Sequence, residues 1–326
     1  MSTNLWKFPT DVEPSKKATR ESYGAALAEL GESYDFVVLD ADLAAATKTG
    51  VFKKKYPDRF FDCGIAEGNM MAVAAGIAAT GKNVFASSFA MFAAGRAFEQ
   101  VRNAIGYPHL NVKIGATHAG ITVGEDGATH QCLEDIALMR TIPGMTVLCP
   151  ADATEAFACV KAALEHYGPV YMRFGRFAVP DYSAYLQDYR FEIGRGVVYR
   201  EGSDATIVAT GYMVHLAIEA AKILEGEGIS AAVVDLHTIK PIDRELLVRM
   251  AEQTGAIVTA EEHNVIGGLG AAVCETLAET CPVPVLRVGT EDTFGRSGKV
   301  PPLLELYGLT AGHIAEQVRR AIAMKK

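Results

Sequence analysis

Two histidines and two acidic residues are concentrated in one short stretch near the middle of the chain. The segment GEDGATHQ at 124–131 contains Asp126 and His130, and the segment THAG just upstream contains His118. An imidazole can donate a hydrogen bond to an oxygen that gains negative charge, and a carboxylate can accept one from a hydroxyl group. These three side chains are therefore candidates for contacts with an oxygen-rich substrate. On composition alone a plain turn is an equally good interpretation, because Gly and Asp are common in loops.

Two further motifs precede this stretch. Glu67 lies in the segment IAEGN, directly before an apolar helical segment, where the helix dipole by itself would favour an acidic residue. Phe89 and Phe92 are three residues apart in the segment SSFAMF, a spacing that predicts one helical face packed in the core. Neither motif alone indicates a reaction.

The elements that position these residues follow an alternating pattern. From about residue 18 onward, short apolar runs alternate with segments of helical period, which is typical of βαβ units with a parallel sheet. A strand predicted at 112–115 ends just before His118, and ligands gather at the carboxyl ends of such strands. The Tyr- and Asp-rich connector at 179–190 predicts a boundary between two doubly wound α/β domains, at 15–180 and 190–326.

Composition narrows the class of protein. The 326 residues are 49% hydrophobic and carry a formal net charge of −8, and the short basic run at 53–55 is best interpreted as a solvated face. We therefore expect neither a nucleic-acid partner nor a membrane surface. No apolar run is long enough for a membrane span or an export signal. Six cysteines without a C-x-x-C pair predict reduced thiols and a cytoplasmic protein.

Taken in order, the motifs resemble those of a known family. The segments RFFDCGIAEGN, SSFAMF, GEDGATHQ and PGMTVLCPAD are similar to the pyrimidine-binding domain of transketolases. The segments DLHTIKPID, EEHNVIGGLG, FGRSG and YGLT resemble the domain that follows it in that family. The resemblance extends from about residue 15 to the end of the chain, and four motifs in the right order make chance similarity improbable.

The resemblance implies thiamine diphosphate as cofactor. Glu67 matches the glutamate that hydrogen-bonds the pyrimidine N1′ and so promotes loss of the thiazolium C2 proton. Phe89 and Phe92 match aromatic residues that pack on the pyrimidine ring, and Asp42 also falls among the expected cofactor contacts.

The resemblance also implies a sugar phosphate substrate. His118 and His130 match catalytic residues that face the sugar hydroxyls and the carbonyl oxygen, and Asp126 matches a residue that binds a hydroxyl. Arg20 and Arg173 match the arginines that hold the terminal phosphate, for which a planar guanidinium is well shaped. The implied reaction is transfer of a two-carbon ketol unit from a ketose phosphate to an aldose phosphate.

One position departs from the family pattern. Where transketolases often have a serine that contacts the phosphate, this chain has Ala46 in the segment ADLAAA. We expect Arg176 or Thr47 to compensate, or the identity of the sugar to differ.

The chain lacks one half of the site that the resemblance implies. In this superfamily a separate domain with a G-D-G motif binds the diphosphate and its metal, and no such segment occurs here. We therefore expect a partner subunit that carries this domain and binds Mg²⁺ (or Ca²⁺), in an α2β2 heterotetramer with closed symmetry.

Three alternatives stay open on the sequence. The first is the β subunit of a 2-oxo-acid dehydrogenase E1 component, which shares the two domains and an IAE motif. The second is an enzyme resembling 1-deoxyxylulose-5-phosphate synthase, and the third is a non-catalytic scaffold.

In the C-terminal half, the GGLG segment is interpreted as helix packing rather than anion binding, and His237 and His263 are interpreted as structural.

Overall fold

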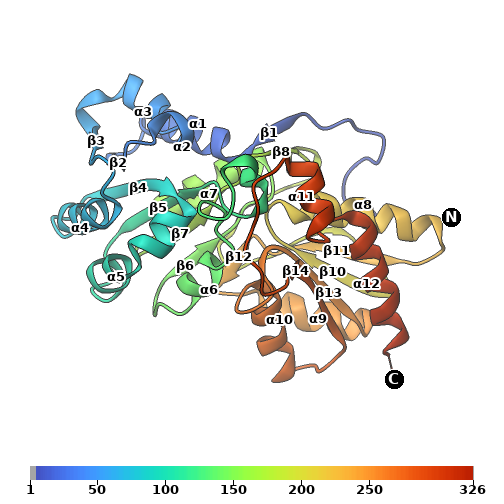
Figure 1. The fold of residues 1–326 in the computed structure, drawn as a ribbon. Coiled ribbons are helices and arrows are strands. Elements are labelled where there is room, and N and C mark those ends of the chain that lie inside the picture. Colours follow the sequence, from blue (N-terminus) through green and yellow to red (C-terminus); the bar gives the residue numbers. More distant parts are fainter. Residues whose placement is uncertain (1–4, 326) are drawn as a thin grey trace.

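A seven-stranded sheet forms the centre of the first half of the chain (Figure 1). The computed structural model describes residues 5–325. The strand order of this sheet is β12-β6-β7-β5-β4-β2-β3, and all neighbouring strands are parallel except the antiparallel pair β12 and β6. The strands are β2 (Phe36–Asp40), β3 (Phe60–Asp62), β4 (Asn83–Phe89), β5 (Val112–Thr117), β6 (Thr146–Leu148), β7 (Val170–Arg173) and β12 (Thr238–Lys240).

A five-stranded sheet organises the second half, in the order β14-β13-β10-β11-β9. Its strands are parallel apart from β9 at one edge. They are β9 (Val197–Arg200), β10 (Ala205–Ala209), β11 (Ala231–Asp235), β13 (Ile257–Asn264) and β14 (Val285–Thr290). Two mainly parallel sheets confirm the predicted fold class.

Helices follow most strands of both sheets, as the alternation in the sequence predicted. Helix α1 packs against α7 in the first half, and α8 packs against α12 in the second. Asp152 caps α7, because its side chain accepts a hydrogen bond from the Glu155 amide at 3.1 Å. The helices are α1 (Thr19–Leu30), α2 (Ala44–Thr47), α3 (Gly50–Lys55), α4 (Glu67–Ala78), α5 (Phe98–Gln100), α6 (Asp135–Arg140), α7 (Ala153–Glu165), α8 (Met213–Gly226), α9 (Arg244–Thr254), α10 (Leu269–Ala278), α11 (Val300–Leu306) and α12 (Ala311–Ala323).

The two halves exchange segments across the predicted boundary. Strand β12 comes from the second half of the chain and yet forms an edge of the first sheet. In return, the N-terminal segment runs over the second half, where the Lys7 amide donates to the Tyr199 carbonyl at 2.9 Å (Figure 1). A short antiparallel pair, β1 (Lys16–Ala18) and β8 (Ala178–Pro180), lies between them. Each half of the chain therefore contributes a segment that pairs with the other half.

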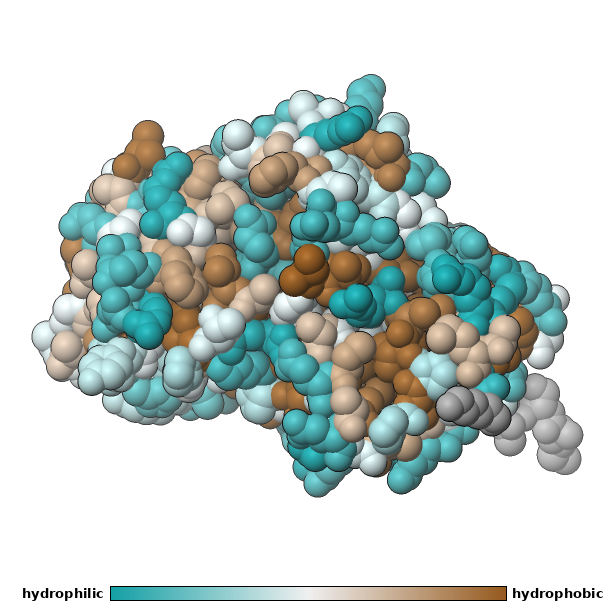
Figure 2. All heavy atoms as spheres, turned by 60° about the horizontal axis from the view of Figure 1, so that its bottom comes forward, coloured by the Kyte–Doolittle hydropathy of each residue, from teal (hydrophilic) through white to brown (hydrophobic). Residues whose placement is uncertain are grey.

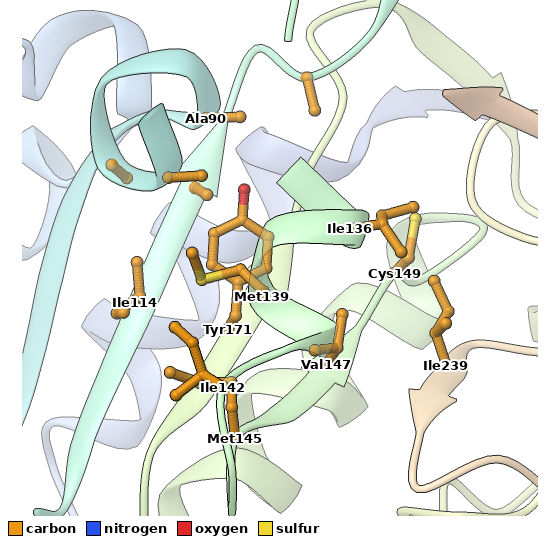
Figure 3. Packing of buried hydrophobic residues seen from close by; sticks show 14 of the residues in the cluster. Ala90, Ile114, Ile136, Met139, Ile142, Met145, Val147, Cys149, Tyr171 and Ile239 are labelled. Atoms are coloured by element: carbon orange, nitrogen blue, oxygen red, sulfur yellow. The ribbon is translucent and has the colours of Figure 1, made fainter. Parts of the chain in front are cut away.

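One buried apolar cluster continues across this junction. Figure 3 shows Met139 and Ile142 beside Tyr171 of β7, with Val147 of β6 and Ile239 of β12 on the other side. All five side chains are almost completely buried. Burial of this continuous surface couples the two sheets through the hydrophobic effect.

The surface is mixed in polarity on the face that Figure 2 shows. Figure 2 shows polar side chains over much of one face, interrupted by apolar patches. Within residues 5–325, no helix combines the length and apolar character that a bilayer span requires. All six cysteines are unpaired.

Candidate active site

His118 lies directly after the end of β5, in a backbone turn with φ of 56°. Its Nε2 lies 3.0 Å from Nη1 of Arg20, and its Nδ1 lies 2.9 Å from Oγ1 of Thr117. A guanidinium has only donors, so Nε2 must be the acceptor and Nδ1 carries the proton. Burial, with help from Arg20 and Arg176, lowers the pKa of His118 to about 3. The imidazole is therefore neutral, and its acceptor nitrogen faces Arg20.

A cluster of positive side chains surrounds this histidine. Nη1 of Arg20 also donates to the carbonyl of Ala46 at 2.9 Å, so the position that lacks a serine holds the arginine through its backbone. Burial, and then the charge of Arg176, lowers the pKa of Arg20. Arg176 itself donates to the Val123 carbonyl, and Lys48 adds a further charge near His118. The arrangement concentrates positive potential where an anion would be stabilised.

Arg173 is not part of this cluster. Its Nε donates to Asp135 at 2.8 Å, and both side chains are almost completely buried. Its Nη2 donates to the carbonyls of Glu262 at 2.8 Å and Cys132 at 3.3 Å. The structure therefore does not support the phosphate contact predicted for Arg173, because its guanidinium is committed to protein acceptors at the junction of the two halves.

Glu67 is the first residue of α4 and is only 2% exposed. Both of its carboxylate oxygens contact Nη1 of Arg96, at 2.9 and 3.0 Å. The guanidinium of Arg96 in turn lies 4.4 Å from the ring centre of Phe92, a cation–π contact. Arg96 was not singled out in the sequence, because nothing in its spacing from Glu67 indicates a contact.

A cavity of about 470 Å³ opens beside this pair. Its lining residues are Ala41, Asp42, Leu43, Ile65, Glu67, Phe92, Arg96, Thr129 and His130. A buried carboxylate and an aromatic ring on its walls fit an aromatic heterocycle with a basic ring nitrogen, such as an aminopyrimidine. The cavity brings together Glu67, Asp42, Phe92 and His130, which are far apart in the sequence.

Aromatic contacts link this cavity to the positive cluster. The ring of Phe89 stacks on His118 with centroids 3.8 Å apart, and the ring of Phe92 is parallel to that of Phe89 at 5.9 Å. His130 meets the ring of Phe92 edge-on at 5.2 Å. Phe89 ends β4 and Phe92 lies in the π-helical turn that follows, so the pair does not lie on one regular helix as its spacing predicted.

Asp126 and His130 lie on the loop after β5. Asp126 is exposed at the end of a 3₁₀ segment, Ile121–Asp126, and His130 is half-buried with its Nδ1 2.9 Å from Oγ1 of Thr129.

Within the described part of the chain, no group of three or more His, Cys, Asp or Glu side chains could hold a metal ion.

This chain is similar to known proteins over almost its whole length. The family model "Transketolase, pyrimidine binding domain" matches residues 15–181, and "Transketolase, C-terminal domain" matches residues 194–314. A putative transketolase C-terminal section from Methanocaldococcus jannaschii is 50% identical over 304 residues, which are 93% of this chain and 95% of that protein. A 6-deoxy-6-sulfo-D-fructose transketolase subunit from a Clostridium species is 44% identical over 97% of this chain and 98% of its own length. A solved structure of a split gene transketolase, described as an inactive beta4 tetramer, superposes with a TM-score of 0.88 at 58% identity, covering 95% of this chain and 99% of that chain.

Proposed function

This chain belongs to the transketolase family, and we propose that it acts as the subunit of a split, thiamine-diphosphate-dependent transketolase that supplies the pyrimidine half of the active site. The proposed reaction transfers a two-carbon ketol unit from a ketose phosphate to an aldose phosphate. The observation that carries the proposal is the buried Glu67 on the wall of a cavity that also contains Phe92 and His130. Bound thiamine diphosphate would supply the carbon nucleophile and the electron sink for this chemistry.

Glu67 would share a proton with the pyrimidine N1′. The Glu67 side chain is 2% exposed and borders the cavity, where its carboxylate would meet a ring nitrogen of the cofactor. Arg96 contacts both oxygens of that carboxylate, so the ring nitrogen would share it with the guanidinium or displace the guanidinium. Phe92 and Phe89 would pack on the ring, and Asp42 lies at the same cavity.

The two histidines would have different tasks. His118 is a neutral acceptor at Nε2, suited to a sugar hydroxyl or to holding Arg20, and its proton at Nδ1 is used by Thr117. Donation to the substrate carbonyl oxygen is therefore assigned to His130, which borders the cavity. Asp126 would accept from a sugar hydroxyl.

Arg20 and Arg176 would hold the terminal anionic group of the sugar. The positive charge of Arg176 lowers the pKa of Arg20, and a bound dianion would offset the repulsion between the two guanidinium groups. A guanidinium pair binds tetrahedral oxyanions in general. A sulfonate therefore fits the same cluster, and the 6-deoxy-6-sulfo-D-fructose named for the Clostridium relative makes a sulfosugar the second candidate substrate.

A partner subunit would supply the diphosphate-binding domain and the Mg²⁺ (or Ca²⁺) site, in an α2β2 heterotetramer in the cytoplasm. The proposal is supported by the relatives named as a C-terminal section and as a split gene product. Their similarity over nearly the whole chain also favours transketolase over the β subunit of a 2-oxo-acid dehydrogenase.

The test is ketol transfer from xylulose 5-phosphate to ribose 5-phosphate. This chain, its N-terminal partner, thiamine diphosphate and Mg²⁺ are combined, and each component is omitted in turn. We expect activity only with all four components. Turnover of 2-oxo acids without ketol transfer would contradict the proposal, and so would full activity of this chain without the partner.

A further inference from the structure

The loop that carries Asp126 and His130 is held from the second half of the chain. We call residues 118–131 the substrate loop. Its two ends meet where Ala119 pairs with Cys132 and the Gly120 amide donates to the Cys132 carbonyl at 3.0 Å. Between these ends the loop lies against residues of β13 and of the segment after β14.

The side chain of Glu262, in β13, contacts the backbone of the loop at Gly120 and Thr122. Its side chain is 2% exposed, and its Oε1 accepts a hydrogen bond from the Thr122 amide at 2.5 Å. Gly120 has φ of +81°, and a Cβ at that position would lie 2.3 Å from the carboxyl carbon of Glu262. Only glycine lets the backbone come so close, so the loop is shaped around this carboxyl group.

The position of Glu262 is itself fixed. Its backbone carbonyl accepts from Nη2 of Arg173 at 2.8 Å, and Arg173 is paired with the buried Asp135. Burial raises the pKa of Glu262 to about 7, against the opposing effects of Arg173 and the Thr122 amide and with a smaller upward effect of Asp135. Loss of this contact would leave the buried Thr122 amide without its acceptor and the buried Glu262 carboxyl group without its donor.

A second segment of the C-terminal domain holds the other side of the loop. Nε2 of Gln131 donates to the Arg296 carbonyl at 2.9 Å, and Oγ of Ser297 donates to the Glu125 carbonyl at 2.5 Å. A Cβ at Gly127, where φ is +75°, would lie 3.2 Å from Cβ and the amide nitrogen of Ser297. The loop is thus clamped on both sides of Asp126.

We propose that the C-terminal domain positions the substrate loop, and that Glu262 is the positioning residue that fixes it through the Thr122 amide. This inference rests on the proposed function and gives the C-terminal domain a part in it. Glu262 would act on the sugar substrate through the geometry of Asp126 and His130, without touching the sugar. The loop borders the proposed cofactor cavity at Thr129 and His130, whereas Glu67 and Phe92 lie outside the loop. Cofactor binding would therefore change less than sugar binding.

The test compares Glu262→Ala with Glu262→Gln in the assembled, cofactor-loaded enzyme. Glu262→Ala removes an acceptor from a buried amide, and we expect kcat/KM for the ketose phosphate to fall by at least about tenfold, with a smaller rise in the KM for thiamine diphosphate. Glu262→Gln keeps a carbonyl acceptor and should stay within about threefold of the natural enzyme. Glu261→Ala is the matched control, since Glu261 is equally buried on β13 but accepts from the Leu269 and Gly270 amides of α10.

Amide hydrogen exchange gives a readout that does not depend on activity. In the assembled enzyme, Glu262→Ala should exchange faster in peptides from 118–131, whereas Glu261→Ala should exchange faster only around α10. Ser297→Ala, an exposed change, should loosen the loop near Glu125 even if Glu262→Ala fails to fold. Unchanged exchange in the loop, or a KM for thiamine diphosphate that rises as much as that of the sugar, would overturn the proposal. An inactive natural enzyme with a protected loop would instead refute the proposed function.

Discussion

The buried pair of Arg173 and Asp135 offers a direct test of how the two halves are joined. In Arg173→Met, a side chain of similar length replaces the guanidinium, while Asp135 stays at 0% exposure with Tyr171 as its remaining donor at 2.8 Å. The carbonyls of Cys132 and Glu262 also lose their hydrogen bonds from Arg173, although the Cys132 carbonyl keeps the one from the Gly120 amide.

The expected cost follows from these contacts. Removing one partner of a buried ion pair costs about 3–5 kcal/mol, because the other charge is left uncompensated. The three lost hydrogen bonds, at about 1 kcal/mol each, give a similar lower bound. For domains of this size the loss corresponds to a fall in Tm of roughly 6–20 °C.

The assay is thermal and urea unfolding of the purified chain, followed by circular dichroism. Arg319→Met is the control, since Arg319 forms an exposed ion pair with Glu227 and should change stability little. Combining Arg173→Met with Asp135→Leu should recover much of the loss, because neither charge of the pair is then left unpaired. Arg173→Met could instead be as stable as the natural chain and have a raised KM for sugar phosphates in the assembled enzyme. That result would refute the structural role of Arg173 and support the phosphate contact predicted from the sequence.

Four further predictions concern single residues. Glu67→Ala should abolish ketol transfer while circular dichroism and Tm stay near those of the natural chain, and an unchanged rate would contradict the proposed cofactor contact. Arg176→Ala should raise the KM for a phosphorylated donor by at least about tenfold, as expected for a lost charge-assisted contact, and leave that for an unphosphorylated ketose unchanged in the same steady-state assay. Gly76→Ala, at an exposed position in α4 with open space around its Cβ, should stabilise the chain by about 0.5–1 kcal/mol in urea unfolding, whereas Gly120→Ala should destabilise it. Burial raises the pKa of Glu261 from 4.5 to about 7, so its contribution to stability is full below about pH 4.5 and is lost as the pH rises through 7; Glu261→Gln should reduce that decline in Tm between pH 5 and 8.

The sequence determined the fold class through local signals, and the same signals predicted candidate site residues. Alternating strands and helices predicted two parallel α/β sheets, because each element shows its own period in the chain. The order of short motifs identified the family and predicted Glu67, Phe92, His118 and His130 as site residues. The structure brings Glu67, Phe92 and His130 to one cavity and places His118 beside it, stacked on Phe89.

Only the tertiary structure decided which charges meet. Arg173 and Arg176 are three residues apart in the sequence and look equivalent as phosphate ligands, yet the first is buried against Asp135 and the second lies beside Arg20. Arg96 and Glu67 come from different elements, and their contact follows from how α4 packs beside the turn after β4. Strand β12 likewise joins a sheet from beyond the expected boundary. Side-chain direction and long-range packing set these contacts, and neither leaves a local pattern in a single sequence.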